Sequence, residues 1–338
     1  MNGEAALASS WLADLERQKA EIRIKELGKL TLRRFLESPD FAQPYLLARR
    51  PLAFLGREVL TPAVWAIVDA VDGHGRDVSF DLCKKIFNCT PSDLPGTRRR
   101  TVVIGAGGRG GKTSTLLAPA CVHAAWTTPL DTLAPGEQAA ALIIAPRRRN
   151  ARQCFLMIKG LIESSPMLRG AIISKKAQSL VLRRPDGHEV VIEIVAPDRG
   201  GNNQRSYALV FAAIDEAAFF AAGEAVVNDR DVCAAILQRL VPGGQMWLVS
   251  TPWVDGLGEM ESIIEAEWGK HQSALVAARV GTRMLNPTWD PTGEIERDYR
   301  KRYGDEAANR EILAIPLPRG QQSLFDHAAI KACLALHA

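Results

Sequence analysis

The chain has 338 residues and a formal net charge of +4; 47% of its residues are hydrophobic and 24% are charged. This composition excludes a disordered or collagen-like chain, and no apolar run reaches the length of a membrane-spanning helix. The first residues lack the pattern of a signal peptide, so we expect a cytosolic protein with no membrane partner. The small positive charge permits nucleic-acid contact without indicating it.

The cysteines, at positions 83, 89, 121, 154, 233 and 333, form no CxxC pair and have no histidine at the spacing of a metal site. We interpret them as small buried apolar residues in a reducing compartment, and we do not expect a zinc site.

Residues 10–37 carry apolar side chains such as Leu12, Leu15 and Leu30 at helical spacing, with Ser10 as the N-cap. We predict an amphipathic helix over this stretch. We also predict a mainly helical N-terminal region over residues 1–97, whose function the sequence does not indicate.

From residue 98, short β-rich apolar runs alternate with helical stretches. Strands are predicted at residues 101–104, 140–145, 208–214 and 246–249, with an edge strand at 274–280 and a hairpin formed by residues 179–184 and 189–195. The alternation predicts an α/β core over residues 98–282, with a mainly parallel sheet covered by helices on both faces. Residues 283–338 are charged and helical before Pro316, Pro318 and Gly320, so we predict a C-terminal lid or linker there.

The strongest motif follows the first predicted strand and precedes a helical run. It is the stretch Ala106-Gly107-Gly108-Arg109-Gly110-Gly111-Lys112-Thr113, which we call the phosphate loop. A strand, a glycine-rich loop and a helix N-terminus form the context of a P-loop, in which backbone N–H groups surround phosphates. Ala106 stands where the motif usually has glycine, and an alanine fits there if its φ is negative.

Each position of the phosphate loop has an expected role in binding ATP. Lys112 is expected to reach the β- and γ-phosphates, and Thr113 to bind Mg²⁺. We assign phosphate contacts also to Gly107, Gly108, Gly110, Gly111 and Ser114. The alternative is a glycine-rich turn that matches the motif by chance.

An acidic pair, Asp215 and Glu216, ends the strand predicted at residues 208–214. A strand of this kind delivers a carboxylate to the sheet edge where the phosphate loop also emerges. Asp215 is expected to hold Mg²⁺, and Glu216 to act as general base toward the attacking water. The alternative is that Asp215 is only a helix N-cap.

Three further features are candidates for coupling and for anion contact. Ser250 and Thr251 end the last central strand, where small hydroxyls can sense the γ-phosphate; the alternative is a plain turn before Pro252. Arg109, inside the phosphate loop, is interpreted as a catalytic arginine finger, as a solvent-exposed residue or as a bridge to a neighbouring subunit.

Basic residues open the helix after the second strand, where they oppose the helix dipole and therefore suggest an external anion. They are Arg147, Arg148, Arg149 and Arg152, which we take as DNA-binding candidates through phosphate contacts. The alternative, which applies also to residues 98–100, is a solvated basic face.

Taken together, the phosphate loop with its internal arginine, residues 142–147, 211–220 and 248–252 resemble the large terminases of tailed bacteriophages. Residues 144–168 are similar to the segment after the family's second strand, and residues 215–220 (DEAAFF) to its acidic motif. The resemblance covers roughly residues 98–325 and is specific over 104–252.

The resemblance implies a RecA-like (ASCE) P-loop NTPase fold and an ATP- and Mg²⁺-dependent motor that drives double-stranded DNA into a procapsid. It further implies a homo-oligomeric ring on a portal protein, a small terminase subunit as partner, and the bacterial host cytoplasm as location.

The chain departs from the family pattern in two respects. Large terminases usually continue into a metal-dependent nuclease, whereas no strand-borne acidic cluster follows the core here, and Asp290 and Asp326 are expected to be ordinary surface residues. We therefore expect no nuclease activity from this chain and assign the nuclease to a separate chain or to a missing part. Arg109 also lies one residue nearer the lysine than in many relatives.

Two other functions fit the motifs less well. A helicase-like DNA translocase needs a second RecA-like domain, for which residues 253–338 are too few. An ATP-binding assembly module with negligible turnover is disfavoured by the presence of Lys112, Asp215 and Glu216.

Overall fold

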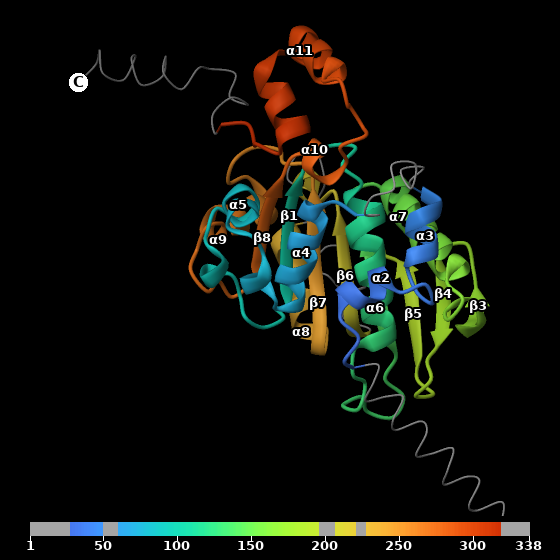
Figure 1. Ribbon diagram of the computed structural model, residues 1–338. Coiled ribbons are helices and arrows are strands. Elements are labelled where there is room, and N and C mark those ends of the chain that lie inside the picture. The colour runs from blue at the N-terminus through green and yellow to red at the C-terminus, as the bar shows by residue number, and fades with distance from the viewer. Residues whose placement is uncertain (1–27, 50–59, 196–206, 221–227, 319–338) are drawn as a thin grey trace, which may run out of the picture.

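The computed structural model describes residues 28–49, 60–195, 207–220 and 228–318. In these ranges the strands form one eight-stranded sheet with the order β3-β4-β5-β2-β6-β7-β1-β8 (Figure 1). Its strands are β1 (Thr101–Ala106), β2 (Ala139–Ile144), β3 (Ile172–Lys175), β4 (Ser179–Arg183), β5 (Glu189–Ile194), β6 (Ala208–Asp215), β7 (Leu240–Ser250) and β8 (Val276–Val280).

The strands from β5 to β8 in this order pair in parallel, which confirms the predicted mainly parallel sheet. All residues of β2 and β6 are buried, as expected for strands covered on both faces. The hairpin is confirmed as antiparallel β4 and β5, and the predicted edge strand as β8. The carboxyl ends of the parallel strands meet at one edge, which we call the carboxyl edge.

Two features of the sheet were not predicted. β3 is a four-residue edge strand with an exposed Ile173, so its sequence shows little strand pattern. β7 begins at Leu240 rather than near Met246, and its pairing with β6 shifts register around Gly243, where φ is 81°. A proline and two glycines in that stretch look like a turn, but they form an irregularity within one strand.

Ten α-helices and several single turns are present among the described residues. The α-helices are α2 (Leu32–Glu37), α3 (Gln43–Arg49), α4 (Pro62–Asp72), α5 (Phe80–Leu82), α6 (Ala118–Thr127), α7 (Arg148–Ser164), α8 (Asp229–Arg239), α9 (Gly258–Glu267), α10 (Thr282–Leu285) and α11 (Glu294–Leu313). The turns are the 3₁₀ segments η2 (Gly75–Asp77), η4 (Pro91–Asp93), η6 (Arg169–Ala171) and η9 (Ala217–Phe220), and the π segments η3 (Cys83–Phe87) and η5 (Thr113–Leu117).

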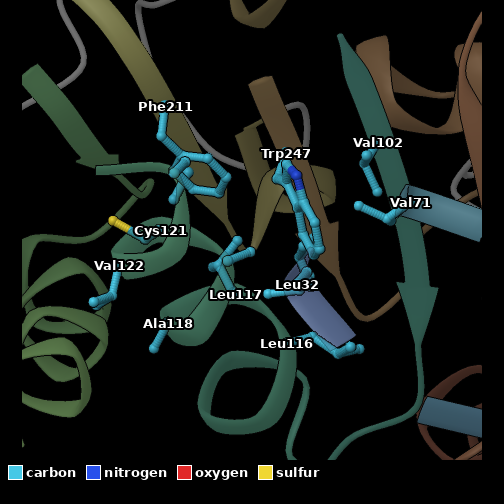
Figure 2. Packing of buried hydrophobic residues seen from close by; sticks show 14 of the residues in the cluster. Leu32, Val71, Val102, Leu116, Leu117, Ala118, Cys121, Val122, Phe211 and Trp247 are labelled. Atoms are coloured by element: carbon cyan, nitrogen blue, oxygen red, sulfur yellow. The ribbon is translucent and has the colours of Figure 1, made fainter. Parts of the chain in front are cut away.

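The helices cover both faces of the sheet (Figure 1). On one face α2, α4, α6 and α7 share a hydrophobic core with the strands; Figure 2 shows Leu32, Leu117, Phe211 and Trp247 among the residues of this core. On the other face α8 and α9 pack against side chains that alternate with these along the strands, such as Val103. This two-sided burial holds the strand ends in fixed positions at the carboxyl edge.

The N-terminal helices differ from the prediction at one point. Residues 10–27 of the predicted helix, with Ser10, lie outside the described residues, and residues 28–31 do not continue it. α2 instead begins anew at Leu32, because the Thr31 hydroxyl accepts a hydrogen bond from the N–H of Arg34 and caps the helix. α2 and α4 bury their apolar residues in the same cluster as β1 and β7.

Other sequence predictions concern burial. α7 buries Ala151, Phe155, Ile158 and Ile162 along one face. Cys83, Cys89, Cys121, Cys154 and Cys233 are buried free thiols, whereas Cys333 lies outside the described residues. Within those residues, no helix is long and apolar enough to cross a membrane.

Candidate nucleotide site

The phosphate loop connects β1 to the helical turn η5 and curls at the carboxyl edge. Ala106 is the last residue of β1, and its φ is not positive, which resolves the departure from the motif. Gly111 has a φ of 84°, which glycine adopts without strain. A side chain at Gly107 would overlap Thr282 and the carbonyl of Ile312. The glycines therefore permit both the curl and a close approach by the C-terminal part of the chain.

Lys112 joins three sequence motifs in one place. Its side chain is largely buried, and its Nζ lies 3.1 Å from Glu216 Oε1 and 3.2 Å from Thr251 Oγ1. The phosphate loop, the acidic pair and the end of β7 are thus brought together at the carboxyl edge. One residue of the acidic pair, Glu216, and one candidate coupling residue, Thr251, therefore lie within hydrogen-bond reach of the Lys112 ammonium group.

Asp215 and Thr113 form the second contact of the site. The Thr113 hydroxyl lies 3.4 Å from each carboxylate oxygen of Asp215, whose residue is only 4% exposed. Burial, and secondly the charge of Glu216, raises the pKa of Asp215 to about 7, against the opposing effects of Lys112 and Thr113. A hydroxyl and a buried carboxylate are oxygen donors of the kind that Mg²⁺ prefers, and a dication there would favour the ionised carboxylate. The residues therefore fit Mg²⁺.

Glu216 is turned toward the site by its backbone. Its φ of 56° lies in the left-handed region, which few residues other than glycine adopt. The Ser250 hydroxyl has two acceptors within reach of its one proton, Glu216 Oε2 at 3.2 Å and the Thr251 carbonyl at 2.8 Å, and the Thr251 N–H lies 3.5 Å from the same Glu216 oxygen. Ser250 is fully buried, so it holds the carboxylate from the protein side, while the Glu216 side chain remains 25% exposed. This is the environment of a group that can reach water.

Arg109 is fixed through its backbone but not through its side chain. Its carbonyl accepts a hydrogen bond of 3.0 Å from Asn286 Nδ2, and its φ is 62°. The side chain is exposed, and no hydrogen bond or ion pair of the guanidinium occurs with other described residues. The finger, solvent and subunit-bridge interpretations of Arg109 all remain predictions.

The phosphate loop is also held by residues that the sequence did not single out. The Gly108 N–H donates to the Glu311 carbonyl at 2.6 Å, and Thr282 Oγ1 donates to the Gly108 carbonyl at 2.7 Å. Most of these contacts use backbone atoms on one side, which any residue type supplies, so no sequence signal could have found them. Figure 1 shows α10 and α11 above the carboxyl edge, where they make these contacts.

The end of α11 also contacts the loop that follows β7. The guanidinium of Arg310 stacks 4.5 Å from the ring centre of Trp253, and the Leu317 N–H donates to the Trp253 carbonyl at 2.9 Å. Trp253 in turn packs on Phe219, which follows the acidic pair. Residues 282–318, which we call the C-terminal segment, therefore contact both the phosphate loop and the loop after Thr251.

The candidate DNA-binding arginines lie at the same edge, beyond β6. α7 begins at Arg148 with Arg147 as its N-cap, and all these arginines are exposed. Arg148, Arg149 and Arg152 line a groove together with Ala177, Gln178 and Ile194. We call this the arginine groove. The structure thus gathers three of the four candidates on one surface.

One expectation about a charged residue is corrected, and two basic residues have contacts that the sequence did not indicate. Arg98 and Arg100 are exposed, as on a solvated basic face, but Arg98 also donates to Gln245 Oε1, and Arg100 donates to the carbonyls of Leu237 and Leu240. Asp290 is not a surface residue but is 2% exposed, because it accepts the N–H groups that begin α11 and pairs with Arg283. It is a helix cap. Asp326 lies outside the described residues.

No protein-family model and no curated protein sequence matches the chain. Among solved structures, the chain is similar to the bacteriophage HK97 large terminase, with a TM-score of 0.50 and 11% identity over 75% of this chain and 50% of that one. It is also similar to the large terminase of a thermophilic bacteriophage (TM-score 0.46, 14% identity, 65% of this chain and 49% of that one). A third similarity is to the large terminase ATPase domain of Thermus phage P74-26 (TM-score 0.42, 19% identity, 64% and 88%).

The chain spans about half the length of the first two of these proteins. The similarity to the HK97 protein shows the fold: the chain has the P-loop ATPase fold found in phage large terminases, as the resemblance of its motifs predicted. The large terminase of the thermophilic bacteriophage has also been solved in complex with ADP.

Proposed function

We propose that this chain is an ATP-hydrolysing motor subunit of the DNA-packaging kind, the ATPase part of a terminase large subunit. The observation that carries the proposal is the convergence of Lys112, Thr113, the acidic pair and Thr251 at one end of the sheet. The terminase-like fold and the motif resemblance support the packaging role.

In this proposal the phosphate loop and Lys112 bind the triphosphate. The γ-phosphate competes with Glu216 for the Lys112 ammonium, so the ion pair at 3.1 Å is exchanged for a contact between Lys112 and phosphate. Thr113 and Asp215 would hold Mg²⁺, which supplies charge neutralisation at the β- and γ-phosphates. Release of Glu216 from Lys112 then leaves its carboxylate free to act as a base.

Hydrolysis requires a proton acceptor beside the γ-phosphate. The oxygen of a water molecule attacks the γ-phosphorus, its proton passes to Glu216, and the bond to the β–γ bridging oxygen breaks to leave ADP and phosphate. Ser250 keeps the Glu216 carboxylate oriented during this step. Thr251, which touches Lys112, is placed to register loss of the γ-phosphate and to pass the change to the loop at Trp253.

We further propose that the arginine groove contacts the phosphate backbone of double-stranded DNA. Contacts of this kind position a duplex without reading its sequence, which suits a translocating motor. Partners follow from the terminase resemblance: a portal protein, a small terminase subunit, further copies of this chain in a ring, and a nuclease on a separate chain or in a part outside this sequence. The bacterial host cytoplasm is the proposed location.

The proposal is tested by replacing the base. Glu216→Gln keeps the size and the Ser250 contact, so the variant should bind ATP with its affinity retained while the hydrolysis rate falls at least about 100-fold. Glu294→Gln, an exposed glutamate at the start of α11, is the matched control. A Glu216→Gln variant that hydrolyses at the wild-type rate would remove Glu216 from the mechanism.

The alternatives are separated by DNA assays. A packaging motor moves along duplex DNA without separating its strands, whereas a helicase-like translocase acts on a single strand. An assembly module binds ATP with negligible turnover under all conditions, including the presence of DNA and portal protein. Absence of hydrolysis in every combination, with ATP binding intact, would favour that module.

A further inference from the structure

A buried ion pair lies beside the candidate nucleotide site but outside the contacts described for it. The guanidinium of Arg279, on β8, lies 2.8 Å from Glu261 Oε2, on α9. The Arg279 side chain is 11% exposed, and Glu261 is fully buried. Taking two charges out of water costs about as much as their attraction returns, so a buried pair is weak evidence for stability. The pair therefore calls for another explanation.

The Glu261 carboxylate is not fully satisfied in its buried position. α9 otherwise buries Met260 and Ile264, which pack with apolar residues of the strands. Glu261 Oε1 accepts no hydrogen bond from the described part of the chain. Burial raises the pKa of Glu261, whereas Arg279 and the nearby backbone N–H of Trp253 act in the opposite direction. An apolar side chain would fill this place without that cost, so packing alone does not account for Glu261.

The pair lies under the first residues of the loop that follows β7. Gly105, the residue of β1 before the phosphate loop, is in register with Arg279. A side chain at Gly105 would meet both Arg279 Cγ and Pro252 Cγ at 3.6 Å. The stem of Arg279 therefore borders the same space as Pro252, and the carboxylate of Glu261 lies near the N–H of Trp253.

The same pair reaches the C-terminal segment. Arg279 Nη1 lies 3.4 Å from the Ala314 carbonyl. Three residues further on, the Leu317 carbonyl accepts the Asp255 N–H at 2.9 Å, and Val254 pairs with Leu317 in a parallel bridge. The ion pair is therefore placed where α9, β8, the loop that follows β7 and the C-terminal segment meet.

The loop that follows β7 is the part of this junction that faces the nucleotide site. It begins at Thr251, whose hydroxyl lies 3.2 Å from Lys112 Nζ and whose N–H lies 3.5 Å from Glu216 Oε2. A displacement of about 1 Å at contacts of this kind is enough to slow a reaction strongly. We propose that Arg279 and Glu261 are positioning residues, which hold Thr251 in place for the hydrolytic step by fixing the two residues that follow it. This inference rests on the proposed function.

The test removes both charges at once, so that neither is left buried without a partner. In the double variant Glu261→Met, Arg279→Met, kcat for ATP hydrolysis should fall about 10-fold or more, while the Kd for Mg·ATPγS stays within about 2-fold of wild type. The single variant Arg279→Lys keeps a positive charge opposite Glu261, so its kcat should stay within about 3-fold of wild type.

A second buried ion pair provides the matched control. Arg184 and Asp186, whose side chains are 2% and 6% exposed, pair at 2.7 Å between β4 and β5, and Arg184 also donates to the Thr128 carbonyl. Because β5 runs parallel to β2, this turn lies at the edge opposite the carboxyl edge. The double variant Arg184→Met, Asp186→Met should shift the midpoint of chemical denaturation as the first variant does but leave kcat unchanged. Two pairs with only a structural role would behave alike in both measurements.

A double-mutant cycle tests the route through Thr251. Thr251→Val removes the hydroxyl that contacts Lys112. If the pair acts through this contact, replacing Glu261 and Arg279 by methionine in the Thr251→Val background should lower kcat by less than about 2-fold, because the contact that the pair positions is already gone. A further loss of about 10-fold would show that the two effects are independent and would overturn the proposed role.

The outcomes separate this inference from the function on which it rests. If the wild type does not hydrolyse ATP, the proposed function fails and the pair has no step to position. If the wild type hydrolyses ATP and the variant without the pair keeps its kcat, the positioning role is overturned and the motor proposal still stands. A matching loss of ATPγS affinity, or failure of that variant to fold, would make the pair a structural element and would also overturn the inference.

Discussion

The two sides of the phosphate loop are built on different principles. Toward β6 and β7, the contacts join side chains: Lys112 to Glu216, Thr113 to Asp215, and Ser250 to Glu216. Toward the C-terminal segment, the acceptors are backbone carbonyls: that of Glu311 accepts from the Gly108 N–H, and those of Gly108 and Arg109 accept from Thr282 and Asn286. In the proposed function the first side carries out the chemistry, so it depends on residue type at both partners. The second side holds the loop in place through its backbone carbonyls and N–H groups, so on the loop it depends mainly on the path of the backbone.

The largest expected effect comes from a change in the side-chain contacts toward β6 and β7. Lys112→Met removes the ammonium that contacts Glu216 and Thr251, and with it the main charge for the γ-phosphate. We expect ATP hydrolysis to fall about 1,000-fold, because charge stabilisation of this kind contributes several kcal/mol. The measurement is steady-state phosphate release, with circular dichroism to verify the fold; Lys84→Met, at a position remote in the sequence and outside the site, serves as control. Retention of more than a tenth of the activity would contradict the role of Lys112.

The same difference explains what the sequence could predict. The parallel core strands were recognisable because their apolar runs are buried on both faces. The proximity of Lys112, Glu216 and Thr251 was predictable because a glycine loop, a carboxylate and a hydroxyl all follow strands that end at the same edge. Three features were not recognisable from the sequence: β3, the start of β7 and the contacts of Glu311. A short half-exposed edge strand, a strand with a proline and glycines, and a backbone carbonyl leave no distinctive residue pattern. Asp290 was misjudged because a buried cap and a surface aspartate look alike in sequence.

A second prediction concerns the contact between the phosphate loop and the C-terminal segment. Gly107→Ala places a methyl group against Thr282 and the Ile312 carbonyl, so the C-terminal segment must shift away from the phosphate loop. We expect the free energy of unfolding to fall by about 2 to 3 kcal/mol, the range for overpacking at a rigid contact. Gly96→Ala is the control, because nothing lies within 4 Å of that position. Chemical denaturation of both variants measures the difference in their free energies of unfolding. Equal stability would contradict the prediction, because it would mean that the C-terminal segment moves away from the phosphate loop without loss of stability.

A third prediction concerns the arginine groove, which lies at the carboxyl edge but takes part in neither set of phosphate-loop contacts. Replacement of Arg148, Arg149 and Arg152 by alanine should weaken duplex DNA binding about 10-fold or more in low salt, and the slope of log K against log salt should fall by up to about 3. The control is the replacement of Arg34, Lys84 and Arg302 by alanine. These residues are exposed on other helices, so the control removes the same amount of positive charge outside the arginine groove. Fluorescence anisotropy across a salt series measures both. An unchanged slope in the groove variant would remove it from the DNA path.

The smallest expected effect is that of a change at Ser250. It tests whether the Glu216 carboxylate must be held in one orientation or needs only its charge. Ser250→Ala removes the hydroxyl that donates to Glu216 Oε2 at 3.2 Å but leaves the charges of Lys112, Asp215 and Glu216 in place. If Glu216 acts as a base that must be oriented, kcat should fall about 10-fold or more with ATP affinity unchanged, since a hydrogen bond to a charged group contributes about 1.5 kcal/mol or more. Ser164→Ala, at an exposed serine bonded to the Gly160 carbonyl, is the control. An unchanged kcat would mean that the left-handed backbone at Glu216 alone aims the carboxylate; a fall in ATP affinity instead would place Ser250 in binding rather than in the hydrolytic step.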